Sequence, residues 1–264
     1  MSLKPLPVGI QSFADLIKGG CVYVDKTERI HSLAQAAKGA YFLSRPRRFG
    51  KSLLISTLQA LFAGQRQLFE GLWIAQQGRW DWQRQHPVMH IDMTQIPRAN
   101  PQELEQGLAH WMREVLKEHQ LQNSVQIEQS AAGLLRDAIR YLCKETPPVL
   151  LIDEYDAPLV DHVGHGKERL AIAQANRAVL KEFYSVLKAQ SSNLRFLFVT
   201  GVSKFAHVSI FSGLSNLDDI SMTQDYATLL GYTQQELETY FATHIKQLAA
   251  QLALSHQHCL DTIR

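Results

Sequence analysis

The chain has 264 residues, of which 45% are apolar and 20% are charged, and its formal net charge is +2. This composition is ordinary for a globular protein, and so small a net charge gives no global argument for binding nucleic acid or an anionic membrane. The length suits one large domain, or one domain with a small appendage, and is sufficient for a sizeable hydrophobic core.

The cysteines and the N-terminal residues indicate the cellular compartment in which the protein works. The three cysteines are far apart and form no Cys-x-x-Cys pair, which argues against a disulfide framework or a zinc site and fits a reducing cytosol. Residues 1–10 lack the apolar segment of a signal peptide, and no run approaches the ~18 apolar residues of a membrane span. The sequence therefore predicts a soluble, cytoplasmic protein that does not enter a membrane.

In chain order, a short strand at 22–24 and a helix at 28–38 precede an apolar strand at 40–43. A basic turn then leads into a helix at 51–62, whose first residues are Lys51 and Ser52 and which follows Gly50. Strand, turn, Gly-Lys-Ser and helix form the context of a phosphate-binding loop. Amides at the helix start and the helix dipole favour phosphate there; Lys51 can reach the β- and γ-phosphates, and the Ser52 hydroxyl can ligate Mg²⁺.

The loop departs from the general pattern at its first glycine, whose position is held by Arg45. The β-carbon of Arg45 and the missing amide of Pro46 weaken phosphate binding by the backbone amides of the loop. An arginine guanidinium that bonds to phosphate oxygens can offset that loss. We therefore expect at least one of Arg45, Arg47 and Arg48 to point into the site, with Arg48 the first choice. The alternatives are a surface turn capped by glycine, or arginines that face solvent or a nucleic-acid backbone.

Between this helix and the next informative strand, three tryptophans at 73, 80 and 82 indicate a small hydrophobic corner, with a base-stacking platform as the alternative. A strand at 88–92 and helices at 101–120 and 130–144 follow.

The strand at 149–152 is a run of four apolar residues that ends in Asp153 and Glu154. Such a run is typical of a buried parallel strand with its chemistry at the carboxyl end. In P-loop ATPases the first acid helps to hold Mg²⁺, and the second can orient and deprotonate the attacking water. The alternative is a solvated strand end. Asp156 is either a partner of these acids or, as we slightly prefer, a helix cap.

A long helix at 167–189 leads to a strand at 194–201, which ends in Thr200 and Gly201. Thr200 fits the polar position that reads the γ-phosphate in additional-strand P-loop ATPases. A last strand is predicted at 219–222, and an amphipathic helix at 233–254 begins at a Thr233 cap with Glu236 three residues later. Alternating strands and helices predict an α/β domain whose central sheet is mainly parallel and flanked by helices.

Two histidine pairs, His162 with His165 and His256 with His258, lack the spacing and carboxylate neighbours of a zinc site. We interpret them as surface residues.

Five blocks in order resemble the bacterial AAA-ATPase-like family between about Pro5 and Tyr232. They are Pro7–Phe13, Tyr23–Thr27, Phe42–Ser52, Leu151–Asp156 and Thr200–Phe205. The family loop is similar to R-P-R-R-F-G-K-S, so Arg45 agrees with the family. The resemblance implies an AAA-like P-loop fold and adenine rather than guanine. It also implies a helical lid after the core, then a domain resembling PD-(D/E)xK nucleases, of which this chain shows no trace.

From these observations we expect a core at 1–230 and, at 231–264, the start of a helical lid that stops early. The expected function is ATP binding with Mg²⁺-dependent hydrolysis; the alternative is a nucleotide-gated switch with negligible turnover that regulates a nuclease-like domain or another partner, nucleic acid included. Oligomeric state is not predicted. The site residues expected to bind nucleotide or Mg²⁺, or to act on them, are Arg45, Arg47, Arg48, Phe49, Gly50, Lys51, Ser52, Leu53, Asp153, Glu154 and Thr200.

Overall fold

The structure is a computed structural model that describes residues 3–76, 78–126, 129–164, 166–202, 211 and 216–262. Its centre is a five-stranded, all-parallel sheet with the order β2-β3-β4-β1-β5. The strands are β1 (Gly39–Ser44), β2 (Val88–Asp92), β3 (Val149–Asp153), β4 (Phe196–Gly201) and β5 (Asp218–Asp219). The predicted α/β fold with a parallel sheet is confirmed.

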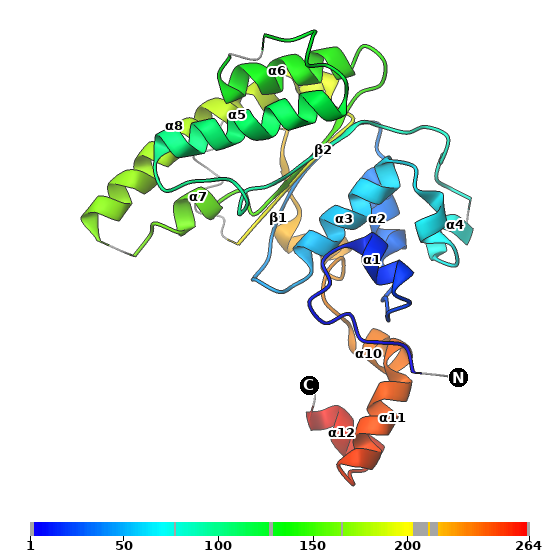
Figure 1. The fold of residues 1–264 in the computed structure, drawn as a ribbon. Coiled ribbons are helices and arrows are strands. Elements are labelled where there is room, and N and C mark those ends of the chain that lie inside the picture. Colours follow the sequence, from blue (N-terminus) through cyan, green and yellow to red (C-terminus); the bar gives the residue numbers. More distant parts are fainter. Residues whose placement is uncertain are drawn as a thin grey trace.

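Helices cover both faces of the sheet (Figure 1). One layer contains α5 (Pro101–Glu118), α6 (Ala131–Leu142) and α8 (Lys167–Ala189); the other contains α1 (Phe13–Lys18), α2 (Thr27–Ala34), α3 (Lys51–Phe62) and α4 (Trp73–Gln76). The remaining helices are α7 (Ala157–Val160), α10 (Gln234–Tyr240), α11 (Ala242–Gln251) and α12 (His256–Thr262). Short 3-10 turns are η1 (Arg66–Phe69), η2 (Ser191–Asn193), η3 (Ile220–Met222) and η4 (Gln224–Tyr226). Each layer buries its own apolar core against the sheet.

The two central strands explain why the polar residues gather where they do. Every residue of β3 and β4 is buried, because helices cover both sides of the sheet. All strands run in one direction, so their carboxyl ends meet at one edge. The register pairs Asp92 with Asp153 and Leu43 with Thr200, which brings the ends of β2, β3, β4 and β1 together.

Several predicted elements have the observed bounds, among them the helices at 51–62 and 167–189 and the strand at 88–92. The strand predicted at 22–24 is wrong. The amide of Val22 donates to the carbonyl of Pro5 at 3.0 Å, but this segment pairs with no strand in the described chain. Its apolar side chains instead help to line a hollow described below.

Two further boundaries differ from the prediction. The helix expected at 28–38 ends at Ala34, since the Arg195 guanidinium donates to the carbonyls of Ala34 and Ala36 at 2.7 and 2.6 Å and satisfies groups that a longer helix would use. The last strand is confined to 218–219, because the Asp219 side chain accepts from the Ser221 amide at 2.9 Å and turns the chain into η3.

The C-terminal helix expected at 233–254 is two helices, α10 and α11, separated at Phe241, and a third helix, α12, follows. The predicted cap is confirmed, since Thr233 and Glu236 form a reciprocal capping box. Phe241 leaves helical geometry at φ −109° and ψ 10°, and its ring lies 5.4 Å from that of Tyr232. We call residues 233–262 the C-terminal helical unit.

The tryptophans form the expected hydrophobic corner. Trp80 packs edge-on against Phe62 and Trp82 packs against Phe69, with centroids 5.5 and 5.1 Å apart. These contacts partly bury the Trp80 and Trp82 rings against the layer of α1 to α4. Among the helices that the structure describes, none is both long and apolar enough to cross a lipid bilayer.

Candidate functional site

The loop between β1 and α3 turns at two left-handed residues. Gly50 is the N-cap of α3 with φ 91°, a conformation that glycine adopts without strain. Arg48 has φ 67°, which is unfavourable for a residue with a side chain. The tight turn is therefore made at Arg48 and Gly50, so the position held by Arg45 need not be glycine.

Lys51 is buried, with 4% of its side chain exposed. Its ammonium donates to the carbonyls of Arg45 and Pro46 at 3.0 and 3.2 Å. The same nitrogen lies 3.1 Å from Oε1 of Glu154. One cation thus joins the loop to the residue that follows β3.

Asp153 connects three elements. Its Oδ2 accepts from the Ser52 hydroxyl at 2.6 Å, and its Oδ1 accepts from the hydroxyl of Thr200, at the end of β4. The Glu154 amide also donates to Oδ1 at 3.1 Å. Asp153 and Thr200 are both buried, so these contacts fix the carboxylate and leave it little freedom to turn.

Glu154 stands where the chain leaves β3 and, like Arg48, has a left-handed backbone, with φ 50°. Its backbone amide points to Asp153 and, at 3.4 Å, to the Thr200 hydroxyl. Burial raises the pKa of Glu154 above its ordinary value, and the neighbouring Lys51 partly opposes that rise. The raised pKa makes this carboxylate a stronger base than an exposed one.

The three loop arginines are in different places. The Arg45 guanidinium donates to the carbonyls of Ser44, the last residue of β1, and Ser221, so it holds η3 against the loop. Arg47 and Arg48 are exposed and line the hollow above Lys51. Two of the three arginines therefore border the site, with Arg48 among them.

This main hollow has a volume of about 820 Å³, within the range of small-molecule sites. Of the predicted site residues, it brings together Arg47, Arg48, Gly50, Lys51, Ser52, Leu53, Asp153 and Glu154. Thr200 lies beneath it, bonded to Asp153. Arg45 and Phe49 are not among its lining residues.

Sequence reasoning missed several residues of the main hollow. They are Asp92, Thr94, Arg98, Asp161, Tyr232 and the segment 7–11. Asp92 ends a strand next to Asp153 and is detectable by the same strand-end rule. Arg98 and Asp161 form an ion pair at 2.6 Å, and no short motif in the sequence joins them.

A smaller hollow of about 310 Å³ adjoins the main one and shares Pro7, Arg48, Gly50 and Tyr232 with it. Most of its other lining side chains are apolar, and Phe49 is one of them. The rest are Leu16, Val22, Tyr23, Val24, Lys26, Leu229, Leu230 and Gly231. A charged hollow thus continues into an apolar one.

Two interpretations of polar residues need correction. Asp156 makes no side-chain cap at the start of α7; it is buried, and its Oδ1 accepts from the Val202 amide at 3.3 Å, which ties the chain after β3 to the chain after β4. His162 is also buried rather than on the surface, and its Nε2 donates to the Arg98 carbonyl at 2.9 Å. His256 and His258 are exposed, as expected. His165 and residues 203–205 lie outside the described residues.

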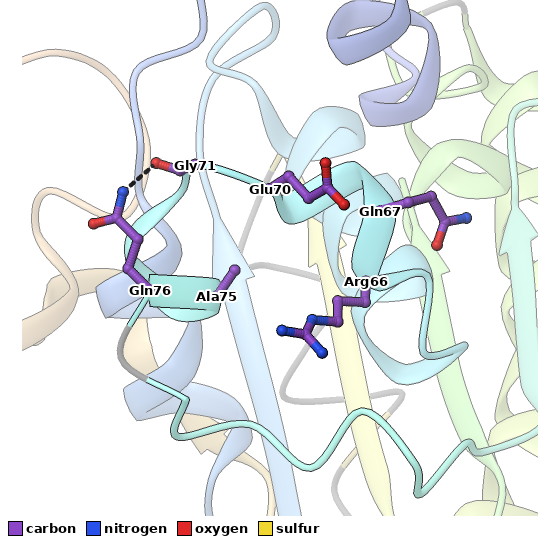
Figure 2. Close-up of a pocket in the computed structure, with 6 residues that line it drawn as sticks. All are labelled: Arg66, Gln67, Glu70, Gly71, Ala75 and Gln76. Atoms are coloured by element: carbon purple, nitrogen blue, oxygen red, sulfur yellow. Dashed lines mark hydrogen bonds between the residues drawn. The ribbon is translucent and has the colours of Figure 1, made fainter.

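A third hollow, of about 490 Å³, lies between η1 and α4 (Figure 2). Four of its six lining residues have polar side chains, and one of them, Gln76, donates to the Gly71 carbonyl at 2.7 Å. It follows the C-terminal end of α3, about 18 Å along that helix from the loop. It contains none of the predicted site residues.

Comparison with known proteins identifies a family and a similar curated protein. A protein of Azotobacter chroococcum mcd 1, described as "Uncharacterized protein in vnfD 5'region", is 41% identical over 252 residues. That match covers 94% of this chain and 47% of the relative, so the chain spans about half the length of the curated relative it matches. No solved structure matches. The model of the AAA-ATPase-like family, described as predicted AAA-ATPase, matches residues 7–211, and the chain therefore belongs to that family.

Proposed function

We propose that this protein binds ATP with Mg²⁺ and hydrolyses it at the edge where β1, β3 and β4 end. The observation that carries the proposal is the 2.6 Å hydrogen bond between Ser52 and Asp153. It joins the start of α3 to the end of β3, and the Lys51–Glu154 pair lies beside it at 3.1 Å. These are the four side chains that a P-loop hydrolase needs in one place.

The phosphates are held by the loop. The amides around Gly50 stand at the N-terminus of α3, where the helix dipole favours anions. Lys51 supplies a point charge, and Arg47 and Arg48 border the same hollow. Arg45 contributes its carbonyl to Lys51, and its guanidinium has structural partners.

The residues present fit Mg²⁺. Ser52 and Asp153 offer hard oxygen donors side by side, the type of ligand that Mg²⁺ prefers. In the part of the chain that the structure describes, no group of three or more His, Cys, Asp or Glu side chains could hold a metal alone, which suits an ion that takes its other ligands from phosphate and water. Mg²⁺ bound there would neutralise charge on the phosphate oxygens.

Glu154 is the base in this proposal. Its carboxylate accepts a proton from water while the water oxygen bonds to the γ-phosphorus. The bond from the γ-phosphorus to the bridging oxygen breaks, and ADP leaves with that electron pair. The Thr200 hydroxyl donates to the Asp153 carboxylate and accepts from the Glu154 amide. It therefore fixes the position of Asp153 relative to the backbone of Glu154.

The apolar hollow suits the base of the nucleotide. It adjoins the loop at Arg48, Phe49 and Gly50, so a base can lie in it while the phosphates meet Lys51. We also place the protein in the cytoplasm, because Cys21, Cys143 and Cys259 are free thiols.

A second candidate is favoured by the Lys51–Glu154 pair itself. A base paired to a lysine at 3.1 Å is not directed at water, which suits a switch that binds ATP with negligible turnover and regulates a nuclease-like domain or another partner, such as nucleic acid.

Titration with a fluorescent ATP analogue, followed by steady-state phosphate release with and without Mg²⁺, separates the candidates. The hydrolase predicts saturable binding and Mg²⁺-dependent release; the switch predicts binding alone. Absence of binding would exclude both.

A further inference from the structure

An ion pair joins the apolar hollow to the C-terminal helical unit. The Lys26 ammonium lies 2.5 Å from Oε1 of Glu236, 210 residues away in the chain. The two side chains are only 11% and 23% exposed, so solvent screens the pair less than a surface pair. Lys26 itself lines the hollow. The start of α10 is thereby held to the wall of that hollow.

Glu236 has a second role that fixes its geometry. Its other oxygen, Oε2, accepts from the Thr233 amide at 2.8 Å, and the Thr233 hydroxyl accepts from the Glu236 amide at 3.2 Å. This capping box leaves the carboxylate little freedom. The position of Lys26 therefore determines where the first turn of α10 lies.

The residue next to that turn is Tyr232, which lines both the main hollow and the apolar hollow. It follows Gly231, whose φ of 73° turns the chain at this point. Tyr232 is 60% exposed, and its ring contacts that of Phe241 in the helical unit. Tyr232 is thus placed by the helical unit, at the boundary between the two hollows.

The helical unit has a small core of its own, formed by Ile245, Ala249, Cys259 and Leu260. That core is separate from the two cores that cover the sheet. The unit also contacts the N-terminal segment through His244, whose Nε2 donates to the Lys4 carbonyl at 2.9 Å. Figure 1 shows α10 to α12 extending away from the sheet layers. The Lys26–Glu236 pair and the His244–Lys4 hydrogen bond each tie the unit to the N-terminal part of the chain.

We propose that Lys26 and Glu236 are a positioning pair that holds Tyr232 as a wall of the nucleobase site. Through this pair, nucleotide retention depends on how the C-terminal helical unit is attached. The inference rests on the proposed function, because it takes the apolar hollow as the seat of the base. Tyr232 contacts the base, and Glu236, which lines neither hollow, acts through it.

The test measures the dissociation rate of a fluorescent ATP analogue in stopped flow. Glu236→Gln keeps an oxygen that can cap Thr233 but removes the charge that Lys26 meets. We expect dissociation to be about tenfold faster, within the 5–150-fold range typical of coupled sites. Glu238→Gln, on the exposed face of the same helix, is the matched control and should match the parent.

Double variants show whether the effect passes through Tyr232. In a Tyr232→Ala background, Glu236→Gln should increase the dissociation rate by less than about twofold, because the side chain that Glu236 positions is gone. The analogue should dissociate from the double variant Lys26→Met, Glu236→Gln no faster than from Lys26→Met alone.

A second readout needs no nucleotide. Trypsin cleavage after the exposed Lys246 should be faster in Glu236→Gln than in the parent and the Glu238→Gln control, with circular dichroism unchanged.

The outcomes separate the two proposals. If the parent does not bind the analogue, the proposed function fails and this inference fails with it. If the parent binds but Glu236→Gln dissociates at the parental rate, the positioning pair is wrong and the proposed function stands. Additive effects of Glu236→Gln and Tyr232→Ala would also overturn the inference.

Discussion

The strand-end site and the C-terminal helical unit are built in different ways. At the site, Asp153 and Thr200 are buried at the ends of two central strands, and their contacts cross between elements that the sheet already holds rigid. The helical unit has a small core and meets the rest of the chain through contacts such as Lys26–Glu236. We therefore propose that the sheet fixes the positions of the catalytic groups, whereas the attachment of the helical unit adjusts nucleotide retention.

The largest expected effect tests the phosphate side of this comparison. Lys51→Ala removes the buried cation that joins the loop to Glu154, and we expect nucleotide affinity to fall by about 100-fold or more, since no other lysine stands in the loop. Equilibrium titration with a fluorescent ATP analogue measures it. Lys181→Ala, on the exposed side of α8, is the control. Affinity within about twofold of the parent would remove Lys51 from the phosphate site.

Asp153→Asn should shift the Mg²⁺ dependence of binding. The amide keeps most of the volume and loses the charge that suits a divalent ion, so the Mg²⁺ concentration at half-maximal binding should rise about tenfold or more. Thr200→Val, which removes the hydroxyl that orients Asp153, should cause a smaller rise. The idea fails if Asn at position 153 leaves the Mg²⁺ titration unchanged.

The arginines divide the loop into a binding part and a structural part. Arg48→Ala should weaken ATP binding by about 1.5–3 kcal/mol, the range for a hydrogen bond to a charged group. Arg45→Ala should leave binding nearly unchanged and lower the free energy of unfolding by about 1–2 kcal/mol, because it loses its bonds to Ser44 and Ser221. Calorimetric binding and urea unfolding measure the two quantities. The reverse pattern would contradict the observed orientation of these side chains.

The smallest expected effect is a loss of local stability at the start of α10 when the pH is lowered. Burial alone would raise the pKa of Glu236, but its hydrogen bond to Lys26 and the Thr233 amide outweigh burial and lower it below 4.5. A lowered pKa means that the carboxylate stabilises the attached state above about pH 4.5 and that this contribution is lost as the pH falls through the lowered value. Trypsin cleavage at Lys246 is unsuitable at that pH, so hydrogen exchange of α10 is the measurement. Glu236→Gln should abolish the pH dependence of the protection factors in that helix, which are the exchange rates corrected for the intrinsic pH dependence of amide exchange.

Much of the fold could be predicted because local signals were strong. The apolar runs of β3 and β4 are short, which favours buried strands over helices, and their ends locate Asp153 and Thr200 without any tertiary information. The signal for the start of α3 was equally local, because it lies in three consecutive residues, Gly50, Lys51 and Ser52. The prediction of a strand at 22–24 was wrong, since its apolar residues line a hollow and none of the described strands pairs with it.

The parts of the site that were missed depend on long-range contacts. Arg45 was expected to bind phosphate, but its partner Ser221 is 176 residues away, in a turn that the sequence suggested as strand. Tyr232 and the 7–11 segment reach the hollow only after the chain has folded. Asp92 is different, since the strand-end rule applied to residues 88–92 would have found it.

The most direct test of the proposed hydrolysis is single-turnover phosphate release by Glu154→Gln. The parent should release phosphate from bound ATP in a Mg²⁺-dependent reaction. The variant should bind ATP at least as tightly, and its phosphate release should be slower by ~10²-fold or more, the usual scale for loss of a positioned base. An equal rate in parent and variant would show that Glu154 is not the base, and the account of the site would be wrong.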